Sequence, residues 1–296
     1  MRFFANSRFA AELELKKENR MLRLLIIIFG GFLISACNKS GDTEVIGESV
    51  TVESTNPEPV AYYEYLWCKQ GANWSEDTSA AFVADWNKEI DAMSDNLDGA
   101  AGYVPRGWTD ERYDGLWVLR WADKAASDRG WAEYAASGAQ ERLEEKYPDR
   151  LECGNTPGTD RFGFEMYAPM ATPDGFASDS SYFLRNQFCN FKEGKSVDDL
   201  RPVVRDQFVP AIQAGKAEGS YPSFWFMIGV PDYEGEDVRD FNWIEFTETA
   251  EETEKNESMF RASEEGQAIV ENFYGVVECT DFQGWDGRIL RRPESL

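Results

Sequence analysis

The segments YYEYLWC at residues 62–68 and FLRNQFC at residues 183–189 decide the fold of this chain. Each is a short aromatic run of the kind that favours a β-strand, and each ends in a cysteine. The two cysteines, Cys68 and Cys189, lie 121 positions apart, and the same shift aligns the amphipathic helices predicted after them. This agreement indicates one structural unit that occurs twice.

A second set of matches supports the duplication. Cys153 and Cys279 lie 126 positions apart, and the same shift superimposes Trp117 on Trp243. The second copy therefore has about five additional residues after its first helix. Cysteines and tryptophans in two constant registers indicate an internal repeat.

Each copy is predicted to contain strand, helix, strand, strand, helix and strand. In the first copy these elements span residues 61–69, 77–93, 98–105, 115–122, 126–145 and 150–155. In the second copy they span residues 181–190, 197–214, 223–230, 240–248, 252–271 and 274–281. This order is the ferredoxin-like split motif, so the predicted fold class is α+β.

These elements give a predicted domain organisation. Copy one covers residues 61–157, a connector 158–180, copy two 181–283 and a C-terminal tail 284–296. The connector is rich in aromatic residues, and we expect it to pack over one end of the fold as a lid or brace.

The four cysteines of the repeat are predicted to form two disulfides. The first and last strands of the split motif are neighbours, which places Cys68 beside Cys153 and Cys189 beside Cys279. Four thiols permit three pairings, and the symmetry of the repeat selects these two. Each bridge would stabilise the fold by about 2–5 kcal/mol. A zinc site built from all four is disfavoured because no C-x-x-C pair is present.

Two such units in one chain resemble the dimeric α+β barrel superfamily, in which two ferredoxin-like sheets pack face to face around a central cavity. The resemblance rests on the element order over residues 61–281. The superfamily includes small cofactor-free monooxygenases and stress-responsive barrels. No catalytic motif of a member is present here, so the resemblance implies an architecture and a central cavity but no particular reaction.

Composition excludes several function classes. The 296 residues include 30 Lys and Arg against 54 Asp and Glu, a formal charge of -24. Such an acidic chain repels phosphate backbones, so no nucleic-acid partner is predicted. The chain has no His, which excludes Ser–His and Cys–His nucleophile pairs and His-ligated haem or zinc. We predict neither a metal nor a cofactor.

Residues 1–36 have the pattern of a signal segment, with a basic start, an apolar run and small residues at its end. The stretch ISAC at 34–37 resembles the lipobox of bacterial lipoproteins, which implies acylation of Cys37. The alternative is an ordinary signal peptide with an incidental cysteine. Met21 is a plausible site at which translation starts. Residues 37–60 are polar and predict a flexible tether. If the host is Gram-negative, Asn38 after the cysteine implies sorting to the outer membrane, facing the periplasm.

Strand alternation identifies candidate ligand contacts. One face of the two quoted strands carries Glu64, Arg185 and Gln187, and we expect this polar face to line the barrel. The alternative for Glu64 and Arg185 is that both are exposed or form structural ion pairs. The alternative for Trp117 and Trp243 is that both pack in the core. The predicted ligand-contacting set is Glu64, Tyr65, Trp117, Arg185, Asn186, Gln187 and Trp243.

The sequence therefore predicts an envelope-anchored lipoprotein whose central barrel cavity binds a small apolar or aromatic molecule, or which docks an envelope protein partner. The alternative prediction is a cofactor-free oxygenase or isomerase that uses the same cavity.

Overall fold

The structure is a computed structural model that describes residues 57–94 and 97–292. The signal segment 1–36, Cys37 and all but the last four residues of the 37–60 tether lie outside the described residues. Within the described part, no helix is both long and apolar enough to cross a membrane.

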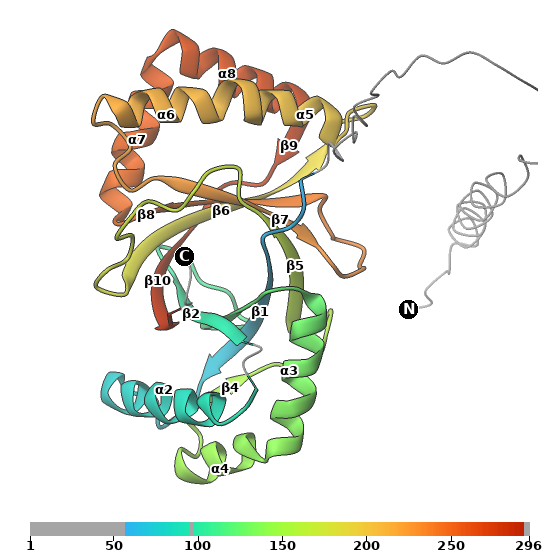
Figure 1. The fold of residues 1–296 in the computed structure, drawn as a ribbon, viewed down its shortest axis with the longest axis vertical. Helices are drawn as coiled ribbons and strands as arrows, with labels where there is room; N and C mark the ends of the chain where they lie inside the picture. The colour runs from blue at the N-terminus through green and yellow to red at the C-terminus, as the bar shows by residue number, and fades with distance from the viewer. Residues whose placement is uncertain (1–56, 95–96, 293–296) are drawn as a thin grey trace, which may run out of the picture. The chain divides into compact units, whose positions relative to one another are not determined.

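The predicted element order is present in both copies, here called the first half and the second half (Figure 1). The first half contains β1 (Ala61–Gln70), α2 (Glu76–Asp91), β2 (Leu97–Pro105), β3 (Gly115–Trp121), α3 (Lys124–Ser137), α4 (Ala139–Lys146), β4 (Leu151–Cys153) and β5 (Arg161–Tyr167). The second half contains β6 (Ser181–Phe191), α5 (Val197–Val203), the π-helical turn η1 (Val204–Phe208), α6 (Val209–Ala217), β7 (Trp225–Pro231), β8 (Phe241–Thr247), α7 (Ala250–Ala262), α8 (Glu264–Val276), β9 (Val277–Cys279) and β10 (Gln283–Arg291).

The second helix of each half is broken into two, where the sequence predicted one. Helix α3 ends at Gly138, whose φ of 68° is left-handed and favours glycine. Helix α7 ends at Ser263, whose hydroxyl then accepts a hydrogen bond of 3.0 Å from the Gly266 amide and caps α8. Local backbone chemistry therefore ends the first helix of each pair and starts the second.

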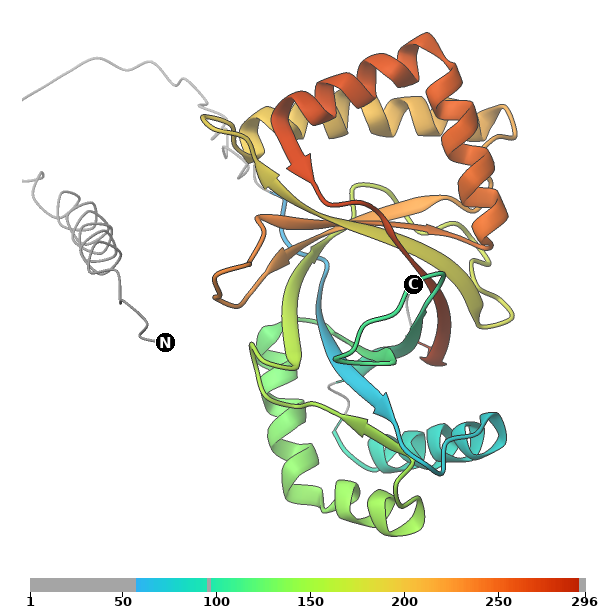
Figure 2. The ribbon, with the colours of Figure 1, turned by 180° about the vertical axis from the view of Figure 1, so that it is seen from behind.

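Two four-stranded antiparallel sheets form a closed barrel. The strand orders are β2-β3-β1-β5 in the first half and β7-β8-β6-β10 in the second. Strand β5 pairs with β7 and β10 pairs with β2, so each half supplies the strand that joins it to the other. Helices α2–α4 cover the outer face of one sheet and α5–α8 that of the other (Figures 1 and 2). The predicted α+β class, with two tandem ferredoxin-like units packed as a pseudo-dimeric barrel, is confirmed.

The connector and the tail as predicted each contain a barrel strand that the sequence analysis missed. Within the 158–180 connector, residues 161–167 form β5, and within the 284–296 tail residues up to 291 belong to β10. Each strand contains a glycine, Gly163 or Gly284, which weakens the sequence signal of a strand. A Cβ at Gly163 would lie 1.8 Å from the Tyr62 Oη, so this glycine makes room for the tyrosine ring.

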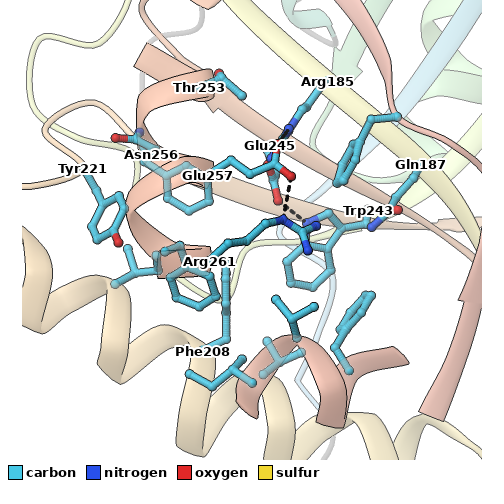
Figure 3. Close-up of a pocket in the computed structure, with 18 of the residues that line it drawn as sticks. Arg185, Gln187, Phe208, Tyr221, Trp243, Glu245, Thr253, Asn256, Glu257 and Arg261 are labelled. Atoms are coloured by element: carbon cyan, nitrogen blue, oxygen red, sulfur yellow. Dashed lines mark hydrogen bonds and ion pairs between the residues drawn. The ribbon is translucent and has the colours of Figure 1, made fainter. Parts of the chain in front are cut away.

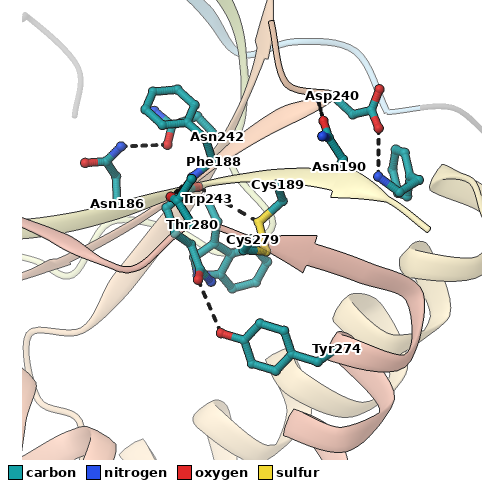
Figure 4. The surroundings of a disulfide bond; sticks show 12 residues. Asn186, Phe188, Cys189, Asn190, Asp240, Asn242, Trp243, Tyr274, Cys279 and Thr280 are labelled. Carbon is teal, nitrogen blue, oxygen red and sulfur yellow. Dashed lines mark hydrogen bonds between the residues drawn. A yellow bond between two sulfur atoms is a disulfide. The ribbon is translucent and has the colours of Figure 1, made fainter. Parts of the chain in front are cut away.

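The predicted disulfides, Cys68–Cys153 and Cys189–Cys279, are confirmed. Each pair occupies directly opposed positions, in β1 and β4 or in β6 and β9. Figure 4 shows the second bridge, beside which the Phe188 amide donates to the Thr280 hydroxyl at 3.1 Å. The bridges hold the two three-residue strands, β4 and β9, to the sheet.

Candidate functional site

The interior of the barrel is filled by aromatic side chains from both sheets. Tyr65 lies 5.3 Å from Phe164, and Tyr103 lies 6.1 Å from Tyr182, between ring centroids. Trp285 also packs on Tyr103 at 6.4 Å. A cavity of only about 70 Å³ remains beside this cluster. The prediction of a ligand-sized central cavity is therefore wrong, because large rings occupy the space that the strand order encloses.

The polar face of β1 and β6 points toward the helices, which corrects the predicted lining of the barrel. Glu64 accepts a hydrogen bond from Ser127 of α3 at 2.9 Å. Arg185 pairs with Glu257 of α7. Buried charged and polar groups need partners, and the helices supply them.

The remaining predicted ligand contacts are divided between the two faces. Gln187 accepts a hydrogen bond from the Tyr274 hydroxyl of α8 at 3.2 Å, so it also faces the helices. Tyr65 and Asn186 face the barrel interior, where the Asn186 amide donates to Asn242 at 2.9 Å. The structure therefore does not bring the seven predicted residues into one site.

A large cavity instead lies between the helices and the sheet of the first half. This first-half cavity has a volume of about 980 Å³, which is in the range of small-molecule sites. Four indoles contribute to its walls: Trp86 from α2, Trp117 and Trp121 from β3, and Trp131 from α3. Trp117, one of the predicted ligand contacts, is thus a cavity wall.

The equivalent space in the second half is filled. Only about 90 Å³ remains there, beside Trp243 and Arg185 (Figure 3). Phe226 is fully buried and stacks on Trp243, with ring centroids 4.5 Å apart. Phe208, from the π-helical turn, packs on the same indole at 5.4 Å. Trp243 is therefore a core residue.

One position accounts for much of this difference between the halves. Phe226 pairs with Glu245 across β7 and β8, and Ala100 occupies the same place opposite Leu119 in β2 and β3. Opposed residues on neighbouring strands share a face, so Ala100 lies on the helix-covered face with Leu119, which lines the first-half cavity, as Phe226 lies on the face of the filled core. A methyl group in place of a phenyl ring leaves Trp117 without a stacking partner there.

Glu64 fixes two of the indoles that wall the first-half cavity. Its Oε2 accepts hydrogen bonds from Trp121 Nε1 at 2.9 Å and Trp131 Nε1 at 2.6 Å. Its Oε1 pairs with Arg161 Nε at 3.4 Å, and the Arg161 guanidinium lies 4.3 Å from the Trp131 ring centre. Glu64 is only 5% exposed. This carboxylate is therefore a positioning residue for the cavity wall.

Arg185 takes the equivalent position in the second half with the opposite charge, as the sequence predicted, but in a separate helix–sheet interface. It donates to Glu245 at 2.7 Å and pairs with Glu257 (Figure 3). Burial opposes its charge, but the two carboxylates raise the pKa of Arg185 above its usual value. Burial likewise disfavours the charge of Glu257, yet Arg185 and Arg261 hold the pKa of Glu257 below its usual range. These groups form a closed ion-pair network.

Arg150 is a cavity residue that the sequence analysis missed. It follows α4, lines the first-half cavity and is 3% exposed. Its guanidinium lies 5.0 Å from the Trp74 ring centre, 4.7 Å from that of Phe82 and 6.0 Å from that of Tyr147. Burial lowers the pKa of Arg150 from its usual value. The sequence analysis places Arg150 at the start of the predicted strand 150–155, where an arginine after Pro148 and Asp149 gives no sign of a cavity position.

Within residues 57–94 and 97–292, no group of three or more Cys, Asp and Glu side chains is arranged to hold a metal ion. The cavity wall therefore offers rings, single charges and hydrogen-bond groups.

Comparison with known proteins yields structural neighbours alone. No protein family profile matches the sequence, and no curated protein sequence matches it. A protein described as a monooxygenase from Lactobacillus acidophilus is 11% identical, with 80% of this chain and 98% of that chain covered at a TM-score of 0.44. A chlorite dismutase variant from Candidatus Nitrospira defluvii is 12% identical, with 79% and 93% covered at 0.45.

A third neighbour, described as a monooxygenase from Fusobacterium nucleatum, is 10% identical, with 80% of this chain and 96% of that chain covered at a TM-score of 0.46. At these identities no activity or ligand transfers to this chain. The strand order and barrel closure described above give this chain the architecture of a dimeric α+β barrel protein, built from two tandem copies.

Proposed function

We propose that the protein binds a small apolar or aromatic molecule in the first-half cavity while a lipid on Cys37 holds it at the bacterial cell envelope. The observation that carries the binding proposal is the aromatic cavity of about 980 Å³, whose counterpart in the second half is filled. Packed interiors rarely leave such space, because each unfilled volume in a core lowers stability.

The binding proposal is tested with N-phenyl-1-naphthylamine, a neutral fluorescent probe of apolar sites. We expect saturable fluorescence enhancement with the full chain. The Ala100→Phe variant should bind at least about tenfold more weakly, because the new ring stacks on Trp117 as Phe226 stacks on Trp243 and occupies the cavity.

The matched control is Ala135→Phe, which adds the same ring at an exposed position of α3. This variant should bind the probe like the wild-type chain. Equal affinity of Ala100→Phe and the wild-type chain would place the probe elsewhere and reject the cavity as its site.

The anchoring proposal rests on the lipobox-like stretch that ends at Cys37. We expect the chain to label with palmitate in a bacterial host and to fractionate with membranes. Cys37→Ala should abolish the label and move the chain to the soluble envelope fraction, since one acylated residue supplies the attachment. If Cys37→Ala still fractionated with membranes, the chain would have another mode of attachment. If both the wild-type chain and Cys37→Ala were found in the soluble fraction, the chain would have no attachment.

The oxygenase or isomerase alternative has less support from the residues. Such chemistry needs a general base within reach of a bound substrate. Both oxygens of Glu64 are engaged by Trp121, Trp131, Ser127 and Arg161. This arrangement suits the positioning of indoles better than proton transfer.

A further inference from the structure

Arg150 is a buried cation without a counter-ion. Neither its Nε nor its Nη1 has a hydrogen-bond partner, and both are inaccessible to water. In the described part of the chain no carboxylate lies within ion-pair distance of the guanidinium. An arginine stays protonated in proteins, and a buried charge is ordinarily paired. The three rings around it compensate only part of that cost.

The third guanidinium nitrogen, Nη2, is the one that solvent can reach. Nη2 has no hydrogen-bond partner among the described residues, but unlike Nε and Nη1 it is not completely buried. Because Arg150 lines the first-half cavity, its guanidinium brings a positive charge to the cavity wall, with Nη2 as the nitrogen that is not enclosed.

Local backbone contacts fix the segment that carries Arg150. The Gly71 amide donates to the Arg150 carbonyl at 2.8 Å, and the Asn73 amide donates to the Asp149 carbonyl at 2.9 Å. A Cβ at Gly71 would lie 2.2 Å from the Asp149 carbonyl oxygen, so only glycine permits this approach. The cation is therefore held in place before any ligand binds, which lowers the entropic cost of recognition.

The other charged groups of the cavity restrict where an anion can sit. Glu133, Glu144, Asp149 and Glu152 also line the cavity. They disfavour negative charge along the wall, and none of them forms an ion pair with Arg150. The second cation of the wall, Lys69, donates to the Glu111 carbonyl oxygen at 2.5 Å.

We propose that the ligand of the first-half cavity is an organic acid, with an aromatic or aliphatic body along the indoles and one carboxylate at Arg150. This inference rests on the proposed binding function and names its ligand class. A carboxylate would give the buried guanidinium the partner that none of the described residues supplies, through a charge-assisted hydrogen bond.

Isothermal titration calorimetry of the full chain with 2-naphthylacetate and with 2-(2-naphthyl)ethanol tests this inference. The two probes share their ring and differ in charge. We expect the acid to bind about 10-fold to 100-fold more tightly than the alcohol, which corresponds to a hydrogen bond with a charged group. Arg150→Met should reduce this ratio to about one.

Two further variants separate charge from folding. Arg150→Lys keeps a cation and should retain part of the preference for the acid. Lys69→Met removes the other cation of the wall and should retain the full preference. Near-ultraviolet circular dichroism checks that each variant keeps its packed aromatic core.

The outcomes distinguish the two proposals. Equal binding of acid and alcohol by the wild-type chain overturns the organic-acid inference but leaves the apolar site in place. No binding of either probe, or of N-phenyl-1-naphthylamine, overturns the binding function itself. A preference for the acid that survives in Arg150→Met would assign the anion to another residue and also overturn the inference.

Discussion

Replacing Phe226 by alanine is expected to lower the free energy of unfolding by about 3–5 kcal/mol, the cost of removing a large aromatic side chain from a core. Phe226 is fully buried and packs on three aromatic partners. Its ring centroid lies 4.5 Å from that of Trp243 and 5.2 Å from that of Phe208. Because Trp243 is fixed in β8 and Phe208 in the π-helical turn η1, the space left by the phenyl ring cannot collapse completely. Urea unfolding followed by far-ultraviolet circular dichroism measures the effect.

The reverse substitution, Ala100→Phe, is the control for this prediction. The same ring is added at the equivalent position, where the first-half cavity has room for it. We therefore expect a much smaller change in stability than for Phe226→Ala. A loss below about 1 kcal/mol for Phe226→Ala, or equal losses for both variants, would contradict the packing difference that we describe between the halves.

Replacing Glu64 by glutamine is expected to cost about 3–5 kcal/mol, because it leaves the Arg161 guanidinium without its carboxylate in a buried setting. The Arg161 side chain is only 15% exposed, so water cannot replace the lost partner. Glutamine keeps one acceptor oxygen for the two indoles and the Ser127 hydroxyl, which all donate to Oε2, but its NH2 group then faces Arg161 in place of Oε1. The same urea unfolding measurement applies.

A double-mutant cycle shows whether the loss comes from this pair. Arg161→Met should be costly in the wild-type chain and much less costly in the Glu64→Gln background, since the unpaired cation is then removed. Glu218→Gln, at an exposed position after α6, should change stability by less than about 0.5 kcal/mol. Additive losses for Glu64→Gln and Arg161→Met would show that the two side chains do not stabilise one another.

A Glu64→Gln chain that remains folded offers a second readout, in the cavity. A neutral amide oxygen accepts more weakly from Trp121 and Trp131 than the carboxylate does, so the wall of the first-half cavity should become less ordered. Weaker binding of N-phenyl-1-naphthylamine by the folded variant would accompany that change. This effect would connect the ion pair beneath the wall to the proposed binding function.

The sequence alone determined the features that depend on local pattern and on repetition. Alternating aromatic runs located β1 and β6, and constant spacings located the duplication. The symmetry of the repeat then selected the pairs Cys68–Cys153 and Cys189–Cys279, which the structure contains. These features were accessible because strand alternation and chain symmetry need no knowledge of distant contacts.

Tertiary structure alone decided which face of each strand meets which neighbour. Alternation divides β1 into a Glu64 face and a Tyr65 face, but it does not say which one the helices cover. That choice follows from partners far along the chain, such as Ser127 and Trp131 for Glu64. The closing strands β5 and β10 were missed for a related reason, since their pairing with β7 and β2 defines them more clearly than their own composition.

The position of the cavity also could not be predicted from the sequence. It depends on the sum of side-chain volumes packed from separate elements, so that Ala100 leaves space where Phe226 fills it. Arg150 acquires its importance in the same way, because three rings from different parts of the chain enclose it and no carboxylate approaches. Local pattern thus determined the elements and their covalent links, whereas long-range packing and charge pairing decided where a ligand can bind.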